Sequence, residues 1–335
     1  MTASRLALAF PDGPPEGRLL VIGARAGDDL SALDPDRTEI QQGSFPDHRA
    51  LGVQGYRVAP RVEGAFDGAL VMLPRAKAEA RARIADAAAR LRPGSALWID
   101  GQKTDGVDSL LKELRGLAAV DEVHSKAHGK IFRLTLPAAD WLPEGWAARP
   151  IEAVPGFVTR PGVFSADGVD PGSALLALHL PDRLPTRMVD LGAGWGWLAA
   201  QVLARPGVET LYLVEADHAA LDSARDNIAD PRAQFLWADA RDVTLPAPVN
   251  GVVMNPPFHE GRSADPALGA AFIATAARLL TGAGRLWMVA NRHLPYEAAL
   301  AAHFAQVTQL GGDGRYKIIE ATGAGRAAGR KGGRR

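Results

Sequence analysis

Three short patterns occur twice along this chain of 335 residues, in the same order and roughly 170 to 190 residues apart. Each is an apolar run with the length of a buried strand, flanked by glycine, proline or a polar turn residue. Such an ordered repeat is typical of a duplicated fold whose loops have changed length. The alternative is that two α/β halves share common strand and turn patterns by chance. The pairs are Leu20–Ala24 with Val189–Ala193, Asp67–Met72 with Asn250–Met254, and Arg92–Trp98 with Thr281–Trp287.

Both halves alternate predicted strands with predicted helices. This alternation favours an α/β fold with a mostly parallel, doubly wound, Rossmann-like sheet in each half. In the first half we predict strands over Arg18–Ile22, Gly68–Leu73, Ala96–Asp100 and Lys130–Leu136, and helices over Ala76–Leu91 and Val107–Leu117. In the second half we predict strands over Arg187–Leu191, Thr210–Val214, Gln234–Trp237, Gly251–Met254 and Arg285–Ala290, and helices over Pro171–Leu178, Trp197–Ala204, Ala219–Ile228 and Pro266–Leu280.

Prolines interrupt the segment from Pro137 to Pro161 too often for a long helix or strand, so we predict the domain linker there. With a boundary near residue 150, the predicted domains cover 1–150 and 151–322. Residues 323–335 form a predicted basic tail, which we expect to be disordered because it offers little apolar surface to bury. Its cations are Arg326, Arg330, Lys331, Arg334 and Arg335.

Composition argues against several classes of protein. The chain has 38 basic and 38 acidic residues and a net charge of zero, so any binding of nucleic acid depends on local patches. It has no cysteine, and only one pair among its eight histidines, His124 and His128, is closely spaced, which is too few ligands for the usual sites, so we expect no metal site. No apolar run is long enough to span a membrane, and the first residues lack a signal-peptide pattern. We therefore expect a cytoplasmic protein without a membrane partner.

A glycine-rich turn, Asp190–Gly196, follows the first predicted strand of the second half. In a doubly wound sheet a ligand binds beyond the carboxyl ends of the strands, and glycines let the backbone approach it closely. Gly192, Gly194 and Gly196 have the spacing Gly-x-Gly-x-Gly, whereas the dinucleotide fingerprint would require a small residue at Trp197. The turn therefore disfavours a nicotinamide cofactor.

Three acids follow successive predicted strands of the second half and suit S-adenosylmethionine. Asp190 can bind an ammonium group, which NAD lacks; Glu215 can accept both ribose hydroxyls, and Asp239 can accept from the adenine amino group. Taken singly, each acid is more often a strand-end cap or a solvated loop residue. We also expect Phe164 to pack against the cofactor, the alternative being a core position. The predicted cofactor-binding residues are Phe164, Asp190, Gly192, Ala193, Gly194, Gly196, Glu215 and Asp239.

The segment Asn255-Pro256-Pro257-Phe258 ends a further predicted strand. Asn255 Oδ1 and the Pro256 carbonyl can accept the two hydrogens of a planar amine and stabilise the positive charge that develops on its nitrogen. Phe258 can stack on a flipped base, and Pro257 stiffens the loop. The alternative is an ordinary Asn-Pro turn. With the glycine turn upstream, the segment predicts methyl transfer from S-adenosylmethionine to an amino nitrogen.

The first half lacks these groups. It has Val21 where the second half has Asp190, Arg25 where that half has Gly194, and Leu73-Pro74-Arg75 in place of the Asn-Pro-Pro-Phe segment. We therefore interpret the first half as a degenerate copy that acts as a scaffold or contacts RNA.

The second half resembles the class I methyltransferases of the RsmC type, which methylate guanine N2 in 16S ribosomal RNA. The resemblance covers residues 156–322, and the first half is similar more weakly, through Asp100–Val107. It implies tandem methyltransferase domains, the first degenerate, with seven-stranded sheets ending in an antiparallel hairpin, here Ala305–Leu310 and Arg315–Ala321. The matching segments are Pro161–Ser165, Asp167–Asp170, Gly172–Ser173, the glycine turn, Asn255–Gly261 and Ala290–Tyr296.

By this resemblance the substrate is a guanine of ribosomal RNA, presented by the small ribosomal subunit, and the cofactor is S-adenosylmethionine. His259, Arg292 and Lys317 flank the expected mouth of the site and are candidates for holding phosphate or base edges, with a solvated surface role as the alternative for each. Other substrates stay open: a guanine of large-subunit RNA, a release-factor glutamine or a DNA amine. A non-catalytic RNA-binding assembly factor is the alternative from another class.

Overall fold

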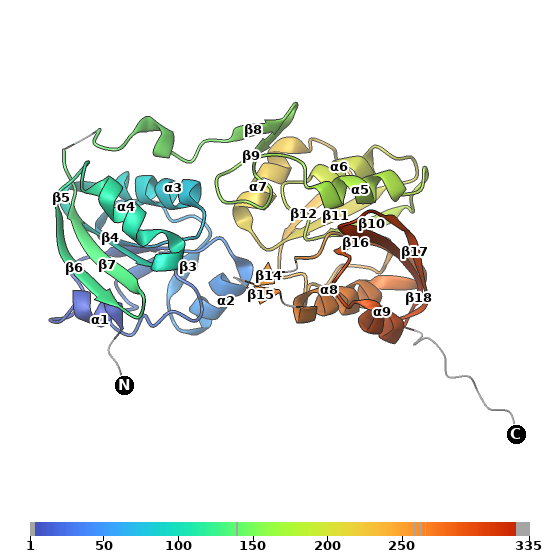
Figure 1. Cartoon of the computed structure of the whole chain (residues 1–335), viewed down its shortest axis with the longest axis horizontal. Coiled ribbons are helices and arrows are strands. Elements are labelled where there is room, and N and C mark those ends of the chain that lie inside the picture. Colours follow the sequence, from blue (N-terminus) through green and yellow to red (C-terminus); the bar gives the residue numbers. More distant parts are fainter. Residues whose placement is uncertain (1–3, 139, 258, 261–262, 265, 326–335) are drawn as a thin grey trace, which may run out of the picture. The chain divides into compact units, whose positions relative to one another are not determined.

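The structure, a computed structural model, describes residues 4–138, 140–257, 259–260, 263–264 and 266–325 (Figure 1). The cations of the predicted basic tail lie outside this range. The chain divides into two compact units, which are described separately below. Unit 1 comprises Met1–Ile151 with Arg160–Gly162, and unit 2 comprises Glu152–Thr159 with Val163–Arg335. No helix among the described residues combines the length and the apolar character needed to cross a membrane.

Unit 1 alternates strands and helices around one sheet, coloured blue to green in Figure 1. Its strands are β1 (Leu19–Ile22), β2 (Thr38–Gln41), β3 (Arg57–Ala59), β4 (Phe66–Met72), β5 (Leu91–Gln102), β6 (Val120–Lys126) and β7 (Gly129–Thr135). Its α-helices are α1 (Arg5–Ala9), α2 (Phe45–Val53), α3 (Lys77–Ala88) and α4 (Val107–Leu114).

Unit 2 has the same alternation. The strands of its main sheet are β10 (Arg187–Leu191), β11 (Thr210–Glu215), β12 (Ala233–Trp237), β13 (Val249–Met254), β16 (Leu280–Asn291), β17 (Phe304–Gly312) and β18 (Tyr316–Ala324). Its α-helices are α5 (Pro171–His179), α6 (Trp197–Leu203), α7 (His218–Asn227), α8 (Pro266–Leu279) and α9 (Glu297–His303). Two small paired sheets complete the strands: β8 (Ile151–Val154) with β9 (Phe157–Thr159), and β14 (His259–Glu260) with β15 (Ser263–Ala264).

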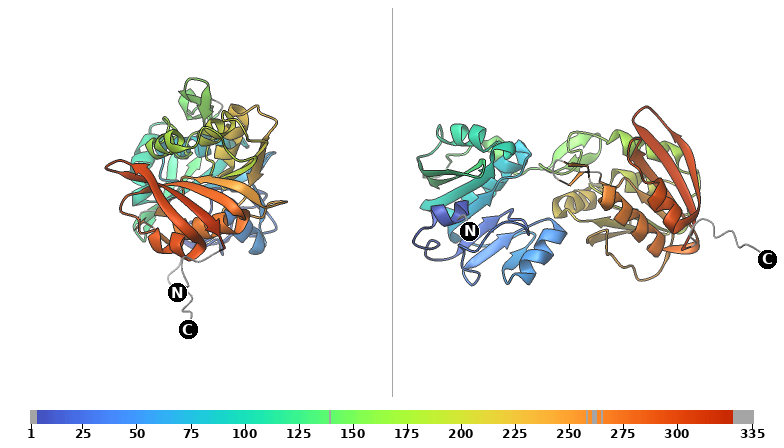
Figure 2. Two further views of the ribbon diagram at one scale, coloured as in Figure 1. Left: turned by 90° about the vertical axis from the view of Figure 1, so that its right-hand side faces the viewer. Right: turned by 60° about the horizontal axis from the view of Figure 1, so that its bottom comes forward.

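The two main sheets have one topology. Their strand orders are β3-β2-β1-β4-β5-β7-β6 and β12-β11-β10-β13-β16-β18-β17. In each sheet the first five strands are parallel and the last two form an antiparallel hairpin, which Figure 2 shows for β17 and β18. The predicted duplication, the α/β class and the terminal hairpin are therefore confirmed.

The pairing registers align the two units residue by residue and correct one part of the sequence comparison. Leu19 pairs with Gly68 in unit 1, and Met188 pairs with Gly251 in unit 2. Both glycines follow a register shift against the next strand, so each marks the same irregularity in its sheet. Counting on from these glycines, Met72 occupies the position of Asn255. The sequence comparison had set Leu73 there, because it did not recognise that strand β4 continues for one more residue.

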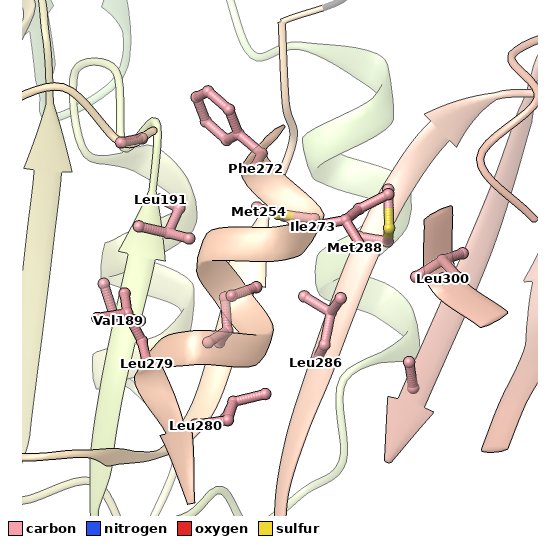
Figure 3. Packing of buried hydrophobic residues seen from close by; sticks show 14 of the residues in the cluster. Val189, Leu191, Met254, Phe272, Ile273, Leu279, Leu280, Leu286, Met288 and Leu300 are labelled. Carbon is pink, nitrogen blue, oxygen red and sulfur yellow. The ribbon is translucent and has the colours of Figure 1, made fainter. Parts of the chain in front are cut away.

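Apolar side chains cover both faces of the sheet in unit 2. Val189 and Leu191 of β10 pack on one face with Ile273 of α8, as Figure 3 shows, together with residues of β16 and α9. Met188, on the opposite face of β10, packs with α5 and α6. Successive side chains of a strand point to opposite faces, so Asp190 lies on the α5 and α6 side, between apolar neighbours. A carboxylate is thereby placed in a buried layer.

Several elements differ from the sequence-based expectations. The predictions missed β2, α2 and β3, which occupy residues 38–59, and also α1, β6 and α9. Strand β5 extends over twelve residues, against the predicted Ala96–Asp100, because Leu91 already pairs with Phe66 before the register shift. The proline-rich segment contains the short hairpin β8–β9 and no long element, as expected.

Candidate active site

A pocket opens over the glycine turn at the carboxyl end of β10. It has a cavity volume of about 50 Å³ and is open to solvent. Gly192 has φ of +78° and donates its N–H to Val214 O at 2.9 Å, so the turn is fastened to the neighbouring strand β11. Gly194 has φ of +56°, and a Cβ there would meet no atom within 4 Å, because it would project into open space. The lining consists of Phe164, Ser165, Asp170, Ser173, Asp190, Gly192, Ala193, Gly194, Trp195, Trp197, Leu198 and Asn255.

Gly196 serves the turn differently from its neighbours. It has φ of +88°, forms the N-cap of α6, and a Cβ there would lie 2.9 Å from Ile228 Cδ1 and 3.1 Å from Ala224 Cβ. Glycine at this position lets α6 begin close to α7. The contact of Gly196 with a cofactor stays a prediction from sequence.

Asp190 is the most unusual polar side chain of the pocket. It is 1% exposed, and neither carboxylate oxygen has a hydrogen-bond partner among the described residues. Burial, followed by the nearby charge of Glu215, raises the pKa of Asp190 to about 8. A buried carboxylate without a partner is costly unless a cation or a donor completes its environment. An ammonium group in the pocket fits this requirement, as predicted for S-adenosylmethionine.

Glu215 ends β11 and is bound to the glycine turn. Its Oε2 accepts from Gly194 N at 2.7 Å, and its Oε1 accepts from Asp217 N at 2.8 Å. Burial raises the pKa of Glu215 to about 7, with a smaller contribution from the charge of Asp217. Each carboxylate oxygen keeps a further lone pair. The side chain can therefore accept ribose hydroxyls while it holds the turn.

Asp239 is engaged within its own turn. Its carboxylate accepts from Arg241 N at 2.8 Å and from Arg241 Nε at 2.9 Å. It also forms an ion pair with the same guanidinium. These bonds compete with an adenine amino group, so the predicted role of Asp239 requires Arg241 to share the carboxylate.

Phe164 lies at the pocket with 59% of its surface exposed, so the alternative of a core position does not hold. Its backbone carbonyl accepts from Trp195 Nε1 at 3.1 Å. This bond ties the segment before α5 to the glycine turn. An exposed ring held at a pocket wall can pack against a bound planar group.

Asn255 follows β13 and is held by two residues from the start of α5. Its Nδ2 donates to Asp170 Oδ2 at 2.7 Å and to Ser173 Oγ at 2.9 Å. Both hydrogens of the amide nitrogen are thus used, and Oδ1 remains as the acceptor that the amide can present. Asp170 is the N-cap of α5, and the sequence analysis missed the contact of Asp170 and Ser173 with Asn255. It joins residues 85 and 82 positions apart.

The remainder of the motif is described in part. Pro256 is buried and Pro257 is exposed. Phe258 lies outside the described residues. His259 begins the short strand β14, whose pairing with β15 is described, whereas its side chain is not. Their proposed roles stay predictions from sequence.

Two predicted substrate contacts have quite different surroundings. Arg292 is exposed, and its Nε donates to Asp313 O at 2.9 Å in the turn between β17 and β18. Lys317 is only 5% exposed; its Nζ donates to Leu294 O at 2.8 Å and forms an ion pair with Glu297. Burial corrects the expectation that Lys317 lies at an open mouth, because its charge is already satisfied inside unit 2.

Unit 1 repeats the Lys317 arrangement. Lys130 pairs with Gly101 across β5 and β7 as Lys317 pairs with Ala290 across β16 and β18. Lys130 Nζ lies 2.5 Å from Asp108 Oδ1, at the start of α4. A lysine bound to the helix that follows the fifth strand is therefore a feature of the shared fold, and this supports a structural role.

The pocket chemistry is absent from the equivalent positions of unit 1. Val21 stands at the position of Asp190, and Gln42 at that of Glu215. The Gln42 amide donates to Ala24 O at 2.5 Å and accepts from Ser44 N at 2.7 Å, so it holds the turn without offering a carboxylate.

A side chain of α3 packs on the glycine turn of unit 1, as a side chain of α8 does in unit 2. A Cβ on Gly23 would lie 1.8 Å from Arg83 Nη1, which donates to Met72 O at 2.9 Å. Arg83 of α3 therefore packs on the Gly23 turn, as Phe272 of α8 packs on the Gly192 turn, where a Cβ would lie 3.3 Å from Phe272 Cε1. The interpretation of this unit as a degenerate copy thus depends on its missing carboxylates and not on this packing.

The chain was compared with known families and proteins. The methyltransferase small domain matches residues 155–320, and the methyltransferase small domain N-terminal family matches residues 15–141. Ribosomal RNA small subunit methyltransferase C of Stutzerimonas stutzeri is 31% identical over 320 residues, covering 91% of this chain and 94% of that protein. The protein of the same name from Hahella chejuensis is 29% identical over 331 residues, covering 92% and 95%.

Among solved structures, the T. thermophilus 16S rRNA N2 G1207 methyltransferase RsmC, in complex with AdoMet and guanosine, is similar over almost the whole chain. The TM-score is 0.81 at 28% sequence identity, with 96% of this chain and 92% of that chain covered. Agreement over both units, together with the pocket of unit 2, leads to one conclusion. The chain belongs to the ribosomal RNA small subunit methyltransferase C family.

Proposed function

We propose that the protein transfers a methyl group from S-adenosylmethionine to the exocyclic N2 amino group of a guanine in 16S ribosomal RNA of the small subunit. The observation that carries this proposal is the amide of Asn255, whose nitrogen is fully bonded and whose oxygen is left to accept from an amine, in the pocket that also contains the unpartnered Asp190. The family and the RsmC complex with AdoMet and guanosine support the cofactor and the base.

Asp190, Glu215 and the glycine turn are the residues that would hold the cofactor. Asp190 would bind the ammonium group and Glu215 the ribose hydroxyls, while Gly192 and Gly194 let the backbone lie close to the ligand. When bound, S-adenosylmethionine supplies an electrophilic methyl group on a sulfonium. The remaining contributions come from the protein's own side chains.

The amino nitrogen of guanine is a weak nucleophile because its lone pair is delocalised into the ring. Asn255 Oδ1 and the Pro256 carbonyl would accept its two hydrogens, which orients the amine and stabilises the positive charge that develops on nitrogen. The nitrogen gains one methyl group and loses one proton, so the products are N2-methylguanine, S-adenosylhomocysteine and a proton. Phe258 is proposed to stack on the base.

A parallel incubation tests the substrate. The protein is mixed with tritiated S-adenosylmethionine and, separately, with small subunits, large subunits, naked 16S RNA and a release factor. We expect label in 16S RNA, with nucleoside analysis giving N2-methylguanosine, and more label with small subunits than with naked RNA. Label in large-subunit RNA or in the release factor alone would replace the proposed substrate. Absence of label in every arm, with the cofactor bound, would favour the non-catalytic assembly factor.

A further inference from the structure

We propose that Asp170 and Ser173 are positioning residues that fix the amide of Asn255 with its oxygen toward the substrate amine, and that the charge of Asp170 strengthens that oxygen as an acceptor. The inference rests on the proposed function, since it concerns the same methyl transfer. We refer to Asp170 and Ser173 together as the amide clamp.

The amide clamp supplies two acceptors to one NH₂ group. Asp170 Oδ2 lies 2.7 Å from Asn255 Nδ2, and Ser173 Oγ lies 2.9 Å from the same nitrogen. All three side chains line the pocket over the glycine turn. Residues at the start of α5 therefore hold Asn255 by its amide nitrogen. Because both bonds use the nitrogen, Oδ1 is left to face the substrate amine.

The orientation of the amide follows from the chemistry of its partner. An ionised carboxylate only accepts hydrogen bonds, so the Asn255 atom facing Asp170 must be the nitrogen. The opposite orientation would set an oxygen against the carboxylate and present NH₂ to the substrate, where it cannot accept from an amine. Asp170 thereby selects substrates that donate N–H.

The local sequence places the amide clamp at the start of α5. Asp170 is the N-cap, and the Oδ2 that binds Asn255 also accepts from Ser173 N at 2.8 Å. Pro171 occupies the first turn, where a missing N–H has no cost. A Cβ on Gly172 would lie 3.0 Å from Asp170 Oδ2 and 3.2 Å from Tyr316 Cε1, so glycine lets the helix begin close to β18. The helix start and the amide of Asn255 thus share one oxygen.

Charge adds to geometry. A hydrogen bond from an amide nitrogen to a carboxylate is stronger than one to a neutral acceptor, and it shifts electron density toward the amide oxygen. In a pocket from which water is partly excluded, this makes Oδ1 of Asn255 a better acceptor for an amine that becomes positive during the reaction. Only the Asn255 amide separates the negative charge of Asp170 from that amine.

Unit 1 has the helix cap of this fold but lacks the amide clamp. Helix α1 packs on β6 and β7 as α5 packs on β17 and β18, so the two helices are equivalent. Ser4 caps α1 by accepting from Ala7 N at 3.3 Å, which preserves the cap of this fold. Alanine, however, replaces the serine three residues after the cap, and Met72 stands at the position of Asn255. Unit 1, which has no counterpart of Asn255, thus keeps a helix cap but has no counterpart of the Asp170 carboxylate or the Ser173 hydroxyl.

Three variants test the amide clamp by single-turnover methylation of small subunits, with cofactor affinity and melting temperature measured for each. Asp170→Asn can keep the cap and the bond to Asn255 through its own oxygen while losing the charge, and we expect the rate to fall about 10-fold. Ser173→Ala removes one acceptor, for an expected loss of about 3- to 10-fold. Asp170→Ala removes cap and charge, for a loss of about 10²-fold. Cofactor affinity should change far less than the rate.

A double-mutant cycle distinguishes positioning from a purely structural role. In an Asn255→Ala background, Asp170→Asn and Ser173→Ala should have almost no further effect on rate, because the amide that they orient is missing. Asp230→Ala is the matched control: Asp230 Oδ1 accepts from Arg232 N at 2.9 Å in the same unit, outside the pocket lining. It should lower the melting temperature without lowering the rate per folded enzyme.

The outcomes separate the two proposals. Full rates for Asp170→Asn and Ser173→Ala, or losses that simply multiply with that of Asn255→Ala, would overturn the amide clamp while leaving guanine methylation intact. A wild-type protein that methylates no guanine would overturn the proposed function itself.

Discussion

Asp190 is next to last in β10 and Glu215 is last in the neighbouring parallel strand β11, and the protein raises the pKa of both. Burial is the main cause for each, and the charge of Glu215 contributes to the value of about 8 for Asp190. Burial disfavours the ionised forms of both acids, and a cation bound beside Asp190 would offset that cost. The burial that makes an ionised Asp190 costly therefore also favours the binding of an ammonium group.

Cofactor binding near pH 7 should therefore release a proton. Asp190, with a pKa of about 8, is largely protonated in the empty pocket, and a bound ammonium group favours its carboxylate. Isothermal titration in buffers of low and high ionisation enthalpy should give heats that differ in the direction of proton release, approaching one proton per cofactor.

The isosteric variant Asp190→Asn is the control for this titration. It should bind S-adenosylmethionine about 10- to 100-fold more weakly, as expected for the loss of a hydrogen bond to a charged group, and its heat should depend much less on the buffer. Equal affinities for wild type and variant would remove Asp190 from the cofactor site.

The stability of the cofactor-free protein should fall as pH rises from about 4 to about 8. The folded-state pKa values of Asp190 and Glu215 lie above the usual values of about 3.9 and 4.3, so the folded protein binds more protons than the unfolded chain in this window. Their stabilisation is present below pH 4 and is lost as pH passes through the folded-state values. Urea unfolding between pH 5 and 9 measures this trend.

Two substitutions should act in opposite directions in that experiment. Asp190→Asn should flatten the decline and raise stability at pH 8, because it removes a buried charge without a partner. Asp230→Asn should lower stability at neutral pH, because hydrogen bonding to Arg232 holds the pKa of Asp230 below its usual value. A decline that is the same in Asp190→Asn and wild type would contradict the account of this pair.

Each chain should bind one molecule of S-adenosylmethionine. Val21 and Gln42 offer no carboxylate at the equivalent turn of unit 1. Titration should give a stoichiometry of one, and Asp190→Ala should abolish the strong binding. Arg83→Ala, which removes the side chain that packs on the turn without restoring an acid, should leave the stoichiometry at one. A second cofactor bound in either protein would show that unit 1 retains a site.

Substitution of Lys317 should affect stability, whereas substitution of Arg292 should affect substrate binding. Lys317→Met leaves Leu294 O without its donor, and we expect a loss of about 1–3 kcal/mol in unfolding free energy with an unchanged KM for RNA. Arg292→Ala should raise the KM and reduce its dependence on salt. Arg285, an exposed arginine of β16 paired with Glu320, is the control for loss of one surface charge. A raised KM in Lys317→Met alone would reverse these roles.

The sequence predicted those parts of the fold whose signal is local. Strand Arg187–Leu191 was predicted with its observed bounds, because its apolar residues Met188, Val189 and Leu191 come directly before a glycine turn. The segment Thr38–Gln41 was missed, because Ile40 is its one large apolar residue and its strand character comes from pairing with β1. Helix α9 was missed for a similar reason, since its only fully buried leucine, Leu300, gives little helical pattern.

The sequence predicted which residues form the candidate site better than it predicted their contacts with one another. Asp190 and Asn255 follow from motifs at strand ends, which any parallel sheet brings to one edge. The bond between Asn255 and Asp170 spans 85 positions, and the ion pair of Lys317 involves Glu297 of the missed helix α9. Such pairings depend on how α5 and α9 pack on the sheet, which local patterns do not encode.

The most direct test of the central claim is nucleoside analysis of 16S RNA after reaction of small subunits with wild type and with Asn255→Ala, each first shown to bind S-adenosylmethionine. We predict N2-methylguanosine with wild type and a yield at least about 10²-fold lower with the variant, because the variant keeps the cofactor site and loses the amine acceptor. Methylation at another atom or nucleobase, or full N2-methylguanosine formation by Asn255→Ala, would contradict the account.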